Sequence, residues 1–298
     1  MEKIGANVFV ETVYPGVNIG CIITDYGSIC VDTPLLPGEA QRWQKLIESL
    51  EGEPVRFVVY TSGQRDRSLG SQYLLSNKPK PVPKSQPRLG IGKGRVLAQR
   101  GAWEKIKDLD TDNFKQSMRD MFADRDPDIV NLQVMLPEIM VDQQAKLHMG
   151  DDVVSLLGAA SGMLWVWLPE QGALFVGDTV VVGTHPPLGV TCTAEWLAAL
   201  AHLRQDPRFQ DAIIVPGRGP LCDVSATEPL TEYLQLARER TDELYQAGRP
   251  KGDLNEVAAD LLPLYTIADG QRERVQRQIK TGLDTLYDEF KAADAASS

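Results

Sequence analysis

The sequence from Pro54 to Arg67 is PVRFVVYTSGQRDR, an apolar and β-branched segment followed directly by polar and charged residues. Val55–Tyr60 predicts a strand, because branched and aromatic side chains favour extended backbone and pack well on a pleated surface. Thr61–Gly70 predicts a loop. This part of the chain therefore combines a core strand with a polar loop.

Three short apolar segments precede this strand, with turn residues between them, and they predict a meander of strands. They are Val8–Thr12, Ile19–Thr24 and Ser28–Asp32. Glu39–Leu50 carries its apolar side chains at spacings of three and four residues and follows Pro37 and Gly38, so it predicts an amphipathic helix.

The cysteines predict free thiols. If Thr24 lies opposite Ser28, Cys21 and Cys30 are one position out of register, and their sulfur atoms point to opposite faces of the sheet. We therefore expect no disulfide between them. The two remaining cysteines, Cys192 and Cys222, show no CxxC spacing.

Downstream, prolines predict a loop at Asn77–Gly94, followed by a short strand at Val96–Gln99 and a largely helical stretch at Gly101–Met121. The strand pattern then resumes, with one further helix and a last strand. These segments are Lys146–Met149, Val153–Leu157, Leu164–Leu168, Ala173–Val176, the helix Thr193–Leu203 and the strand Ala212–Val215.

The end of the chain, Ala226–Ala296, has the composition and apolar spacing of helices. Apolar stripes of this kind cover a core more often than they form a partner surface, so we expect the tail to pack on the rest of the chain. We predict a main domain over residues 1–225 and a helical segment over residues 226–298.

The chain has 298 residues, 43% of them hydrophobic, with a formal net charge of -10 and a pI near 4.9. An acidic chain argues against nucleic acid as the main partner, because phosphate backbones attract clustered Lys and Arg. Met1–Asn18 resembles no signal peptide, and the uncharged run Val153–Pro169 is too short to span a membrane. We expect a cytoplasmic protein without a membrane partner.

Several segments, in their order and spacing, resemble the metallo-β-lactamase superfamily. They are Val8–Thr12, Tyr14–Asn18, Ile29–Pro34, Pro54–Thr61, Leu168–Glu170, Leu174–Asp178 and Val215–Gly217. The resemblance implies an α/β fold (α+β by content), a four-layer αββα sandwich, here with a helical C-terminal extension. It also implies a metal site at one edge of the sandwich.

The family's metal ligands are mostly replaced in this sequence. The His-x-His-x-Asp-His loop of the family corresponds to residues 62–67, where only the aspartate remains, and a later histidine is replaced by alanine and the last one by arginine. The positions that the resemblance assigns to the former metal site are Ser62, Gln64, Asp66, Arg67, Ala159, Asp178 and Arg218.

Asp66 and Asp178 are the strong ligands that remain, whereas Arg67 and Arg218 would place permanent positive charges where cations bind in the family. We predict no metal and no cofactor. Two carboxylates without a cation repel each other, so we expect the arginines to pair with them through bidentate hydrogen bonds. If this network is buried, replacing Arg218 by alanine should cost about 3 to 5 kcal/mol.

Asp32 follows a predicted strand, and the resemblance gives it a scaffold role near the site, in which it accepts hydrogen bonds from loop backbone. The candidates for any catalytic role are Asp66, Asp178 and His185, the last because it follows Asp178 closely in sequence. The other histidines, His148 and His202, are expected to face solvent or to have their hydrogen bonds satisfied.

We interpret the sequence as a non-catalytic binding or regulatory relative of the superfamily, whose partner is a small molecule or a protein. One alternative is a hydrolase with a non-standard or metal-free site that uses the aspartates or His185. Another is a structural role, with an oligomer built by the C-terminal helices. The oligomeric state stays open.

Overall fold

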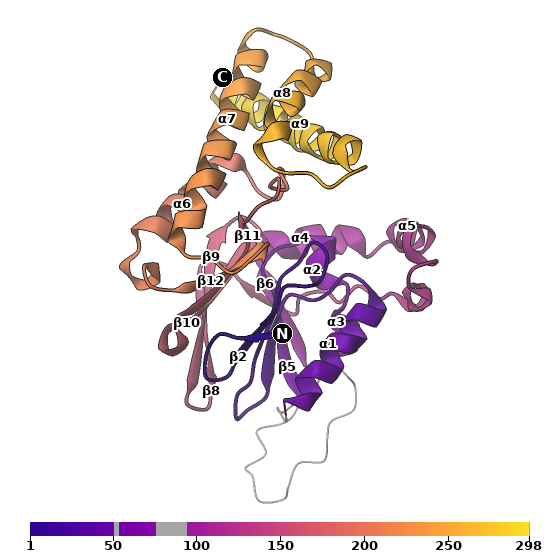
Figure 1. The fold of residues 1–298 in the computed structure, drawn as a ribbon, viewed down its shortest axis with the longest axis vertical. Helices are drawn as coiled ribbons and strands as arrows, with labels where there is room; N and C mark the ends of the chain where they lie inside the picture. Colours follow the sequence, from indigo (N-terminus) through magenta and orange to yellow (C-terminus); the bar gives the residue numbers. More distant parts are fainter. Residues whose placement is uncertain (51–53, 76–93, 298) are drawn as a thin grey trace, which may run out of the picture.

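The computed structural model describes residues 1–50, 54–75 and 94–297. The predicted loop Asn77–Gly94 lies outside these ranges apart from Gly94. Two β-sheets face each other, helices cover their outer faces, and a group of C-terminal helices extends from one end of the sandwich (Figure 1).

The first sheet follows the chain from β1 to β7 in the described residues. Its first four strands pair antiparallel, as predicted for a meander, and the later neighbours pair parallel. The strands are β1 (Glu2–Lys3), β2 (Val8–Glu11), β3 (Ile19–Ile22), β4 (Ser28–Val31), β5 (Val55–Tyr60), β6 (Arg95–Gln99) and β7 (Ile139–Val141).

The second sheet has the order β12-β11-β10-β9-β8. Its strands are antiparallel except β11 and β12, which run parallel. They are β8 (Gln144–Met149), β9 (Asp152–Ala160), β10 (Met163–Leu168), β11 (Ala173–Val181) and β12 (Ile213–Arg218). Each predicted strand of this half is present, and several extend beyond their predicted ends.

Apolar side chains fill three layers. Val59 of β5 and Val166 of β10 belong to the core between the sheets. Trp43 belongs to the core on the outer face of the first sheet, and Trp196 to the core on the outer face of the second. Helix, sheet, sheet and helix therefore stack in that order, which confirms the predicted four-layer αββα sandwich.

The helices on the first sheet include the predicted one before β5. They are α1 (Pro37–Ser49), α2 (Arg65–Ser68), α3 (Ser71–Leu74), α4 (Arg100–Leu109) and α5 (Asp112–Phe122). The single helical stretch predicted at Gly101–Met121 is two helices. Thr111 breaks it, because its backbone is extended and its side chain accepts a hydrogen bond from the backbone N–H of Phe114, which caps the second helix.

The predicted register of β3 and β4 was wrong. Cys21 lies directly opposite Cys30, so the two side chains share one face of the sheet. Both thiols are free, and the contact with Cys21, together with burial, raises the pKa of Cys30 well above its ordinary value. The turn spans Asp25 and Tyr26 only, one residue fewer than assumed, and a shift of one residue reverses the face of every side chain.

The helices of the second half are α6 (Thr193–Gln205), α7 (Thr227–Gln246), α8 (Leu254–Leu261) and α9 (Arg272–Ser297). Short 3₁₀ helices lie at Pro127–Asn131, Pro169–Gln171, Pro207–Phe209, Val224–Ala226, Lys251–Asp253 and Leu262–Leu264. Within the described residues, no helix combines the length and the apolar character that crossing a bilayer requires.

The C-terminal helices contribute side chains to two apolar cores. Leu230 and Leu234 of α7 pack with the outer core of the second sheet. Tyr233, Leu261 and Leu283 belong to a separate apolar cluster among α7, α8 and α9. The tail therefore covers the sandwich at its beginning and forms a small helical core of its own beyond that point.

Replacing Leu234 by alanine should lower the free energy of unfolding by about 2 to 5 kcal/mol, because the side chain is fully buried and the substitution leaves a cavity. Urea denaturation followed by circular dichroism measures the change. Leu264→Ala is the matched control, since Leu264 is 47% exposed and should cost far less. Equal losses for the two variants would contradict the assigned packing.

Candidate functional site

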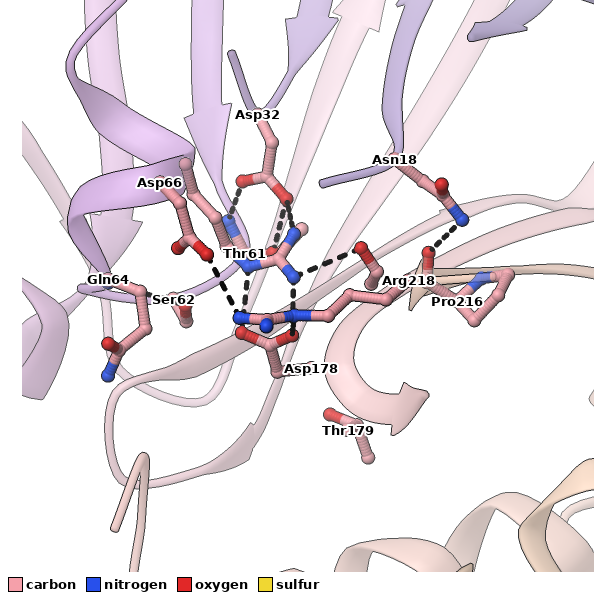
Figure 2. A network of polar contacts seen from close by, with 12 residues as sticks. Asn18, Asp32, Thr61, Ser62, Gln64, Asp66, Asp178, Thr179, Pro216 and Arg218 are labelled. Atoms are coloured by element: carbon pink, nitrogen blue, oxygen red, sulfur yellow. Dashed lines mark hydrogen bonds and ion pairs between the residues drawn. The ribbon is translucent and has the colours of Figure 1, made fainter. Parts of the chain in front are cut away.

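Four strands bring the charged candidates together at one end of the sandwich. Asp32 follows β4, whereas Asp66 and Arg67 lie in α2, which begins shortly after β5. Asp178 lies in β11, and Arg218 is the last residue of β12. Because β4 and β5 are parallel neighbours in one sheet and β11 and β12 in the other, their carboxyl ends meet here. Figure 2 shows the resulting network.

Arg67 is the centre of the network and is 0% exposed. Its Nε donates to Asp178 Oδ2 at 2.9 Å, and its Nη2 donates to Asp178 Oδ1, which makes the pair bidentate. Its Nη1 donates to Asp32 Oδ2 at 2.9 Å, and Nη2 also donates to the carbonyl oxygen of Gly217 at 3.2 Å. A buried guanidinium is thereby paired with two buried carboxylates.

Arg218 forms a second, outer layer of the same network. Its Nη2 donates to Asp66 Oδ2 at 2.9 Å, and its Nε lies 3.3 Å from Asp178 Oδ1. The side chain of Arg218 is 25% exposed and that of Asp66 20%, so this pair reaches solvent. Each arginine therefore pairs with an aspartate as expected, but only the Arg67–Asp178 pair is bidentate, and the second partner of Arg67 is Asp32 and not Asp66.

The charged groups around Arg67 shift one another's pKa values. Burial opposes the charged form of Asp178, but Arg67 and Arg218 outweigh it and hold the pKa of Asp178 below its ordinary value. Burial likewise opposes the charge of Arg67, whereas Asp178 and Asp32 raise its pKa. For Asp32, burial outweighs Arg67 and Thr61 and raises the pKa to about 6.

Asp32 occupies the scaffold position and also takes part in the network. Its Oδ1 accepts a hydrogen bond from the backbone N–H of Thr61 at 2.7 Å, and its Oδ2 accepts one from Thr61 Oγ1 at 2.6 Å. Its φ of 56° lies in the left-handed region, which non-glycine residues seldom adopt. The strained backbone at the end of β4 thus aims one carboxylate at both the loop and Arg67.

Asn18 and Gly217, which we did not name as site residues from the sequence, shape the end of β12 beside the network. The Asn18 side chain donates to the carbonyl oxygens of Pro216 at 2.9 Å and Gly219 at 2.7 Å, as Figure 2 shows in part. A Cβ on Gly217 would lie 2.5 Å from Arg67 Nη2 and 2.6 Å from the backbone of Gly177. A glycine at this position is therefore what lets Arg67 reach Asp178.

The remaining positions that the resemblance assigns to a metal site do not join the network. Ser62 is buried and bridges to β10 through Met163. The side chain of Gln64 points away from Arg218 and Asp178 in Figure 2. Ala159, on β9, carries only a methyl group, which cannot bind a metal.

These residues do not fit the metal that the fold implies. Both oxygens of Asp178 already accept hydrogen bonds from Arg67, and an oxygen of Asp66 accepts one from Arg218. Zinc, iron or manganese requires several nitrogen, oxygen or sulfur ligands around an open position, and two fixed guanidinium charges repel a cation. In the described ranges, no group of three or more His, Cys, Asp or Glu residues is placed to hold one.

His185 lies apart from the aspartates. Its Nδ1 is 3.3 Å from the hydroxyl of Tyr233, and its ring contacts Tyr233 and Tyr265 edge-on. It shares with Arg218 the lining of a pocket of about 440 Å³, to which α9 also contributes Arg274 and Arg277. No local signal in the sequence marks these two arginines, because only the tertiary packing of α9 brings them beside β12.

Replacing Arg67 by alanine should lower the free energy of unfolding by about 3 to 5 kcal/mol, because it leaves the buried Asp32 without a cation and the buried Asp178 with only the outer Arg218. Urea denaturation measures the loss. Arg65→Ala is the control on the same short helix, since Arg65 is exposed and should change stability by less than about 0.5 kcal/mol. A loss for Arg67→Ala no larger than for the control would contradict a buried ion pair.

Replacing Arg218 by alanine should cost less than the value expected for a fully buried network, on the order of 1 to 2 kcal/mol, because this pair is partly exposed. The same denaturation experiment tests it. A loss of stability equal to that of Arg67→Ala would contradict the assignment of Arg218 to the outer, partly exposed layer of the network.

Stability should depend on pH through His185, because burial lowers its pKa below the ordinary value of 6.5. The unfolded chain then binds a proton more readily than the folded one, so the free energy of unfolding falls as the pH decreases below about 6.5. His185→Gln should lack this part of the pH dependence. Denaturation curves collected from about pH 5 to pH 8 for both proteins provide the comparison, and identical slopes would exclude the effect.

Comparison with known proteins places this architecture among solved structures. No protein-family model matches the sequence, and no curated protein matches it. The stereoselective inverting sec-alkylsulfatase of a Pseudomonas species superimposes with a TM-score of 0.68 at 14% identity. That alignment covers 97% of this chain and 49% of the alkylsulfatase, so this chain spans about half of that protein's length.

Two further structures match over most of both chains. A metallo-β-lactamase family protein from Thermus thermophilus has a TM-score of 0.63 and 18% identity, with 96% of this chain and 94% of that chain covered. A β-lactamase domain protein from Burkholderia ambifaria has a TM-score of 0.59 and 13% identity, covering 96% and 86%. This chain therefore has the metallo-β-lactamase fold.

Proposed function

We propose that this protein is a binding or regulatory member of the metallo-β-lactamase fold and not a metal-dependent hydrolase. The observation that carries the proposal is the completely buried Arg67, whose guanidinium pairs with both oxygens of Asp178. A fold supports many functions, so activity must be argued from the site itself. In this site the positive charges are the guanidinium groups of Arg67 and Arg218.

The geometry also argues for ligand binding beside the network. The pocket of about 440 Å³ lies within the size range of small-molecule sites, roughly 300 to 1,000 Å³. Arg218 belongs both to this pocket and to the network, so a bound molecule would contact the outer layer of the charged cluster. We take the ligand to be a small molecule.

We further propose that residues 1–225 form the main domain and residues 226–298 a helical segment that closes one side of this pocket. The separate apolar cluster formed with Tyr233, Leu261 and Leu283 supports the division. The contribution of Arg274 and Arg277 from α9 to the pocket supports the closing role.

Metal content per chain tests the proposal. Protein produced with added zinc, iron and manganese and then gel-filtered should hold less than about a tenth of an equivalent of metal, and added metal should not raise its melting temperature, because a ligand of the folded state must stabilise it. About one equivalent, lost in Asp178→Asn, would overturn the proposal.

A gain-of-metal variant gives this experiment its positive control. It combines Ser62→His, Gln64→His, Arg67→His, Ala159→His and Arg218→His, which together restore the histidines that the superfamily has at these positions. The restored set should retain metal through gel filtration, because imidazole nitrogens replace two repelling charges. This outcome shows that the measurement detects an occupied site in the same scaffold.

A further inference from the structure

Beside Arg218, the segment after β11 and the first turns of α9 form the two walls of one pocket. His185 and Leu188 come from the first wall, and Arg274 and Arg277 come from the second. These residues are far apart in sequence, and only the packing of the C-terminal helices on the sandwich unites them.

The lining of this pocket carries positive charge in an acidic protein. Among the described residues it contains three arginines and no aspartate or glutamate, although the formal net charge of the whole chain is -10. The only hydrogen bond of the Arg274 side chain in the described residues goes to the neutral Gln271, and the Arg277 side chain forms none there. The side chains of both arginines are exposed and free to bind an anion.

Arg218 is the third arginine of the pocket lining. Its Nε and Nη2 contact Asp178 and Asp66, whereas its Nη1 forms no hydrogen bond with any part of the chain that the structure describes. Guanidinium groups bind carboxylate and phosphate oxygens through paired N–H donors. One unused amino group beside two further arginines therefore suits an oxyanion.

Both walls of the pocket also carry apolar side chains. Pro187 and Leu188 contribute to one wall, and Val275 and Ile279 of α9 to the other. A small inorganic anion would leave this surface in contact with water, whereas an apolar group attached to the anion would cover it.

We propose that this pocket binds an organic oxyanion, a molecule with one carboxylate or phosphate group and an apolar body, with its charged group on Arg218, Arg274 and Arg277. The proposal rests on the proposed function, because it names the class of ligand that the non-hydrolytic site would take. The anion would pair with Nη1 of Arg218, which the carboxylates of the network leave unused, and with the exposed side chains of Arg274 and Arg277.

Isothermal titration calorimetry on the full chain tests the proposal with octanoate, octyl phosphate and the neutral 1-octanol as probes. Octanoate or octyl phosphate should bind more tightly than 1-octanol, and the double variant Arg274→Gln/Arg277→Gln should weaken that binding at least about tenfold. Arg272→Gln is the matched control, because Arg272 is an exposed arginine of the same helix that does not line the pocket. The tighter of the two anions identifies the preferred charged group.

Three outcomes would overturn the anion pocket: no binding of either anion, binding of 1-octanol as tight as that of the anions, or an equal loss of affinity in Arg272→Gln. Elemental analysis of the same preparations separates this result from the proposed function. About one equivalent of bound metal together with arginine-dependent anion binding would overturn only the proposed function. Metal-free protein that binds no anion would overturn only the anion pocket.

Discussion

A guanidinium without access to water requires carboxylates around it, and this requirement organises the site. Burying an unpaired charge costs far more than folding can supply, so Arg67 is stable only where Asp178 and Asp32 meet it. These partners come from different sheets, and the ion pairs therefore connect the two halves of the sandwich at their carboxyl ends. In the family that this sequence resembles, a metal ion occupies the corresponding place.

Much of the fold could be predicted from the sequence, because alternation and β-branched segments specify strands locally. Val55–Tyr60 begins and ends as the pattern indicates, whereas the four-layer sandwich was implied by the family resemblance that the order and spacing of the segments carry. The register of β3 and β4 could not be predicted, since it depends on whether the turn at Asp25 and Tyr26 has two residues or three. The prediction of one helical stretch at Gly101–Met121 missed the break at Thr111, because a capping residue inside a helical pattern looks like an ordinary polar position.

The candidate site divides in the same way. The pairing of Arg67 and Arg218 with aspartates followed from the resemblance, which placed these residues in one site, and from charge, because carboxylates without a cation need one nearby. Which arginine is buried did not follow, since burial depends on how α2 packs against the end of β12. The place of Arg274 and Arg277 in the pocket could not be predicted, because nothing in their local sequence distinguishes them from other solvent-exposed helix residues.

The close fit between Arg67 and Gly217 constrains the order in which metal ligands could be introduced into this site. A histidine at position 67 alone would leave the buried Asp32 without its cation and Asp178 with only the outer Arg218, so this variant should be less stable than the present protein. A histidine at position 218 removes the partly exposed pair with Asp66 and the outer contact with Asp178, which keeps its bidentate pair with Arg67. Mutational paths that change the outer arginine first therefore cross a lower stability barrier. A side chain added at position 217 would collide with the backbone of Gly177 and Asp178 whichever residue stands at position 67, so the glycine is required along every path.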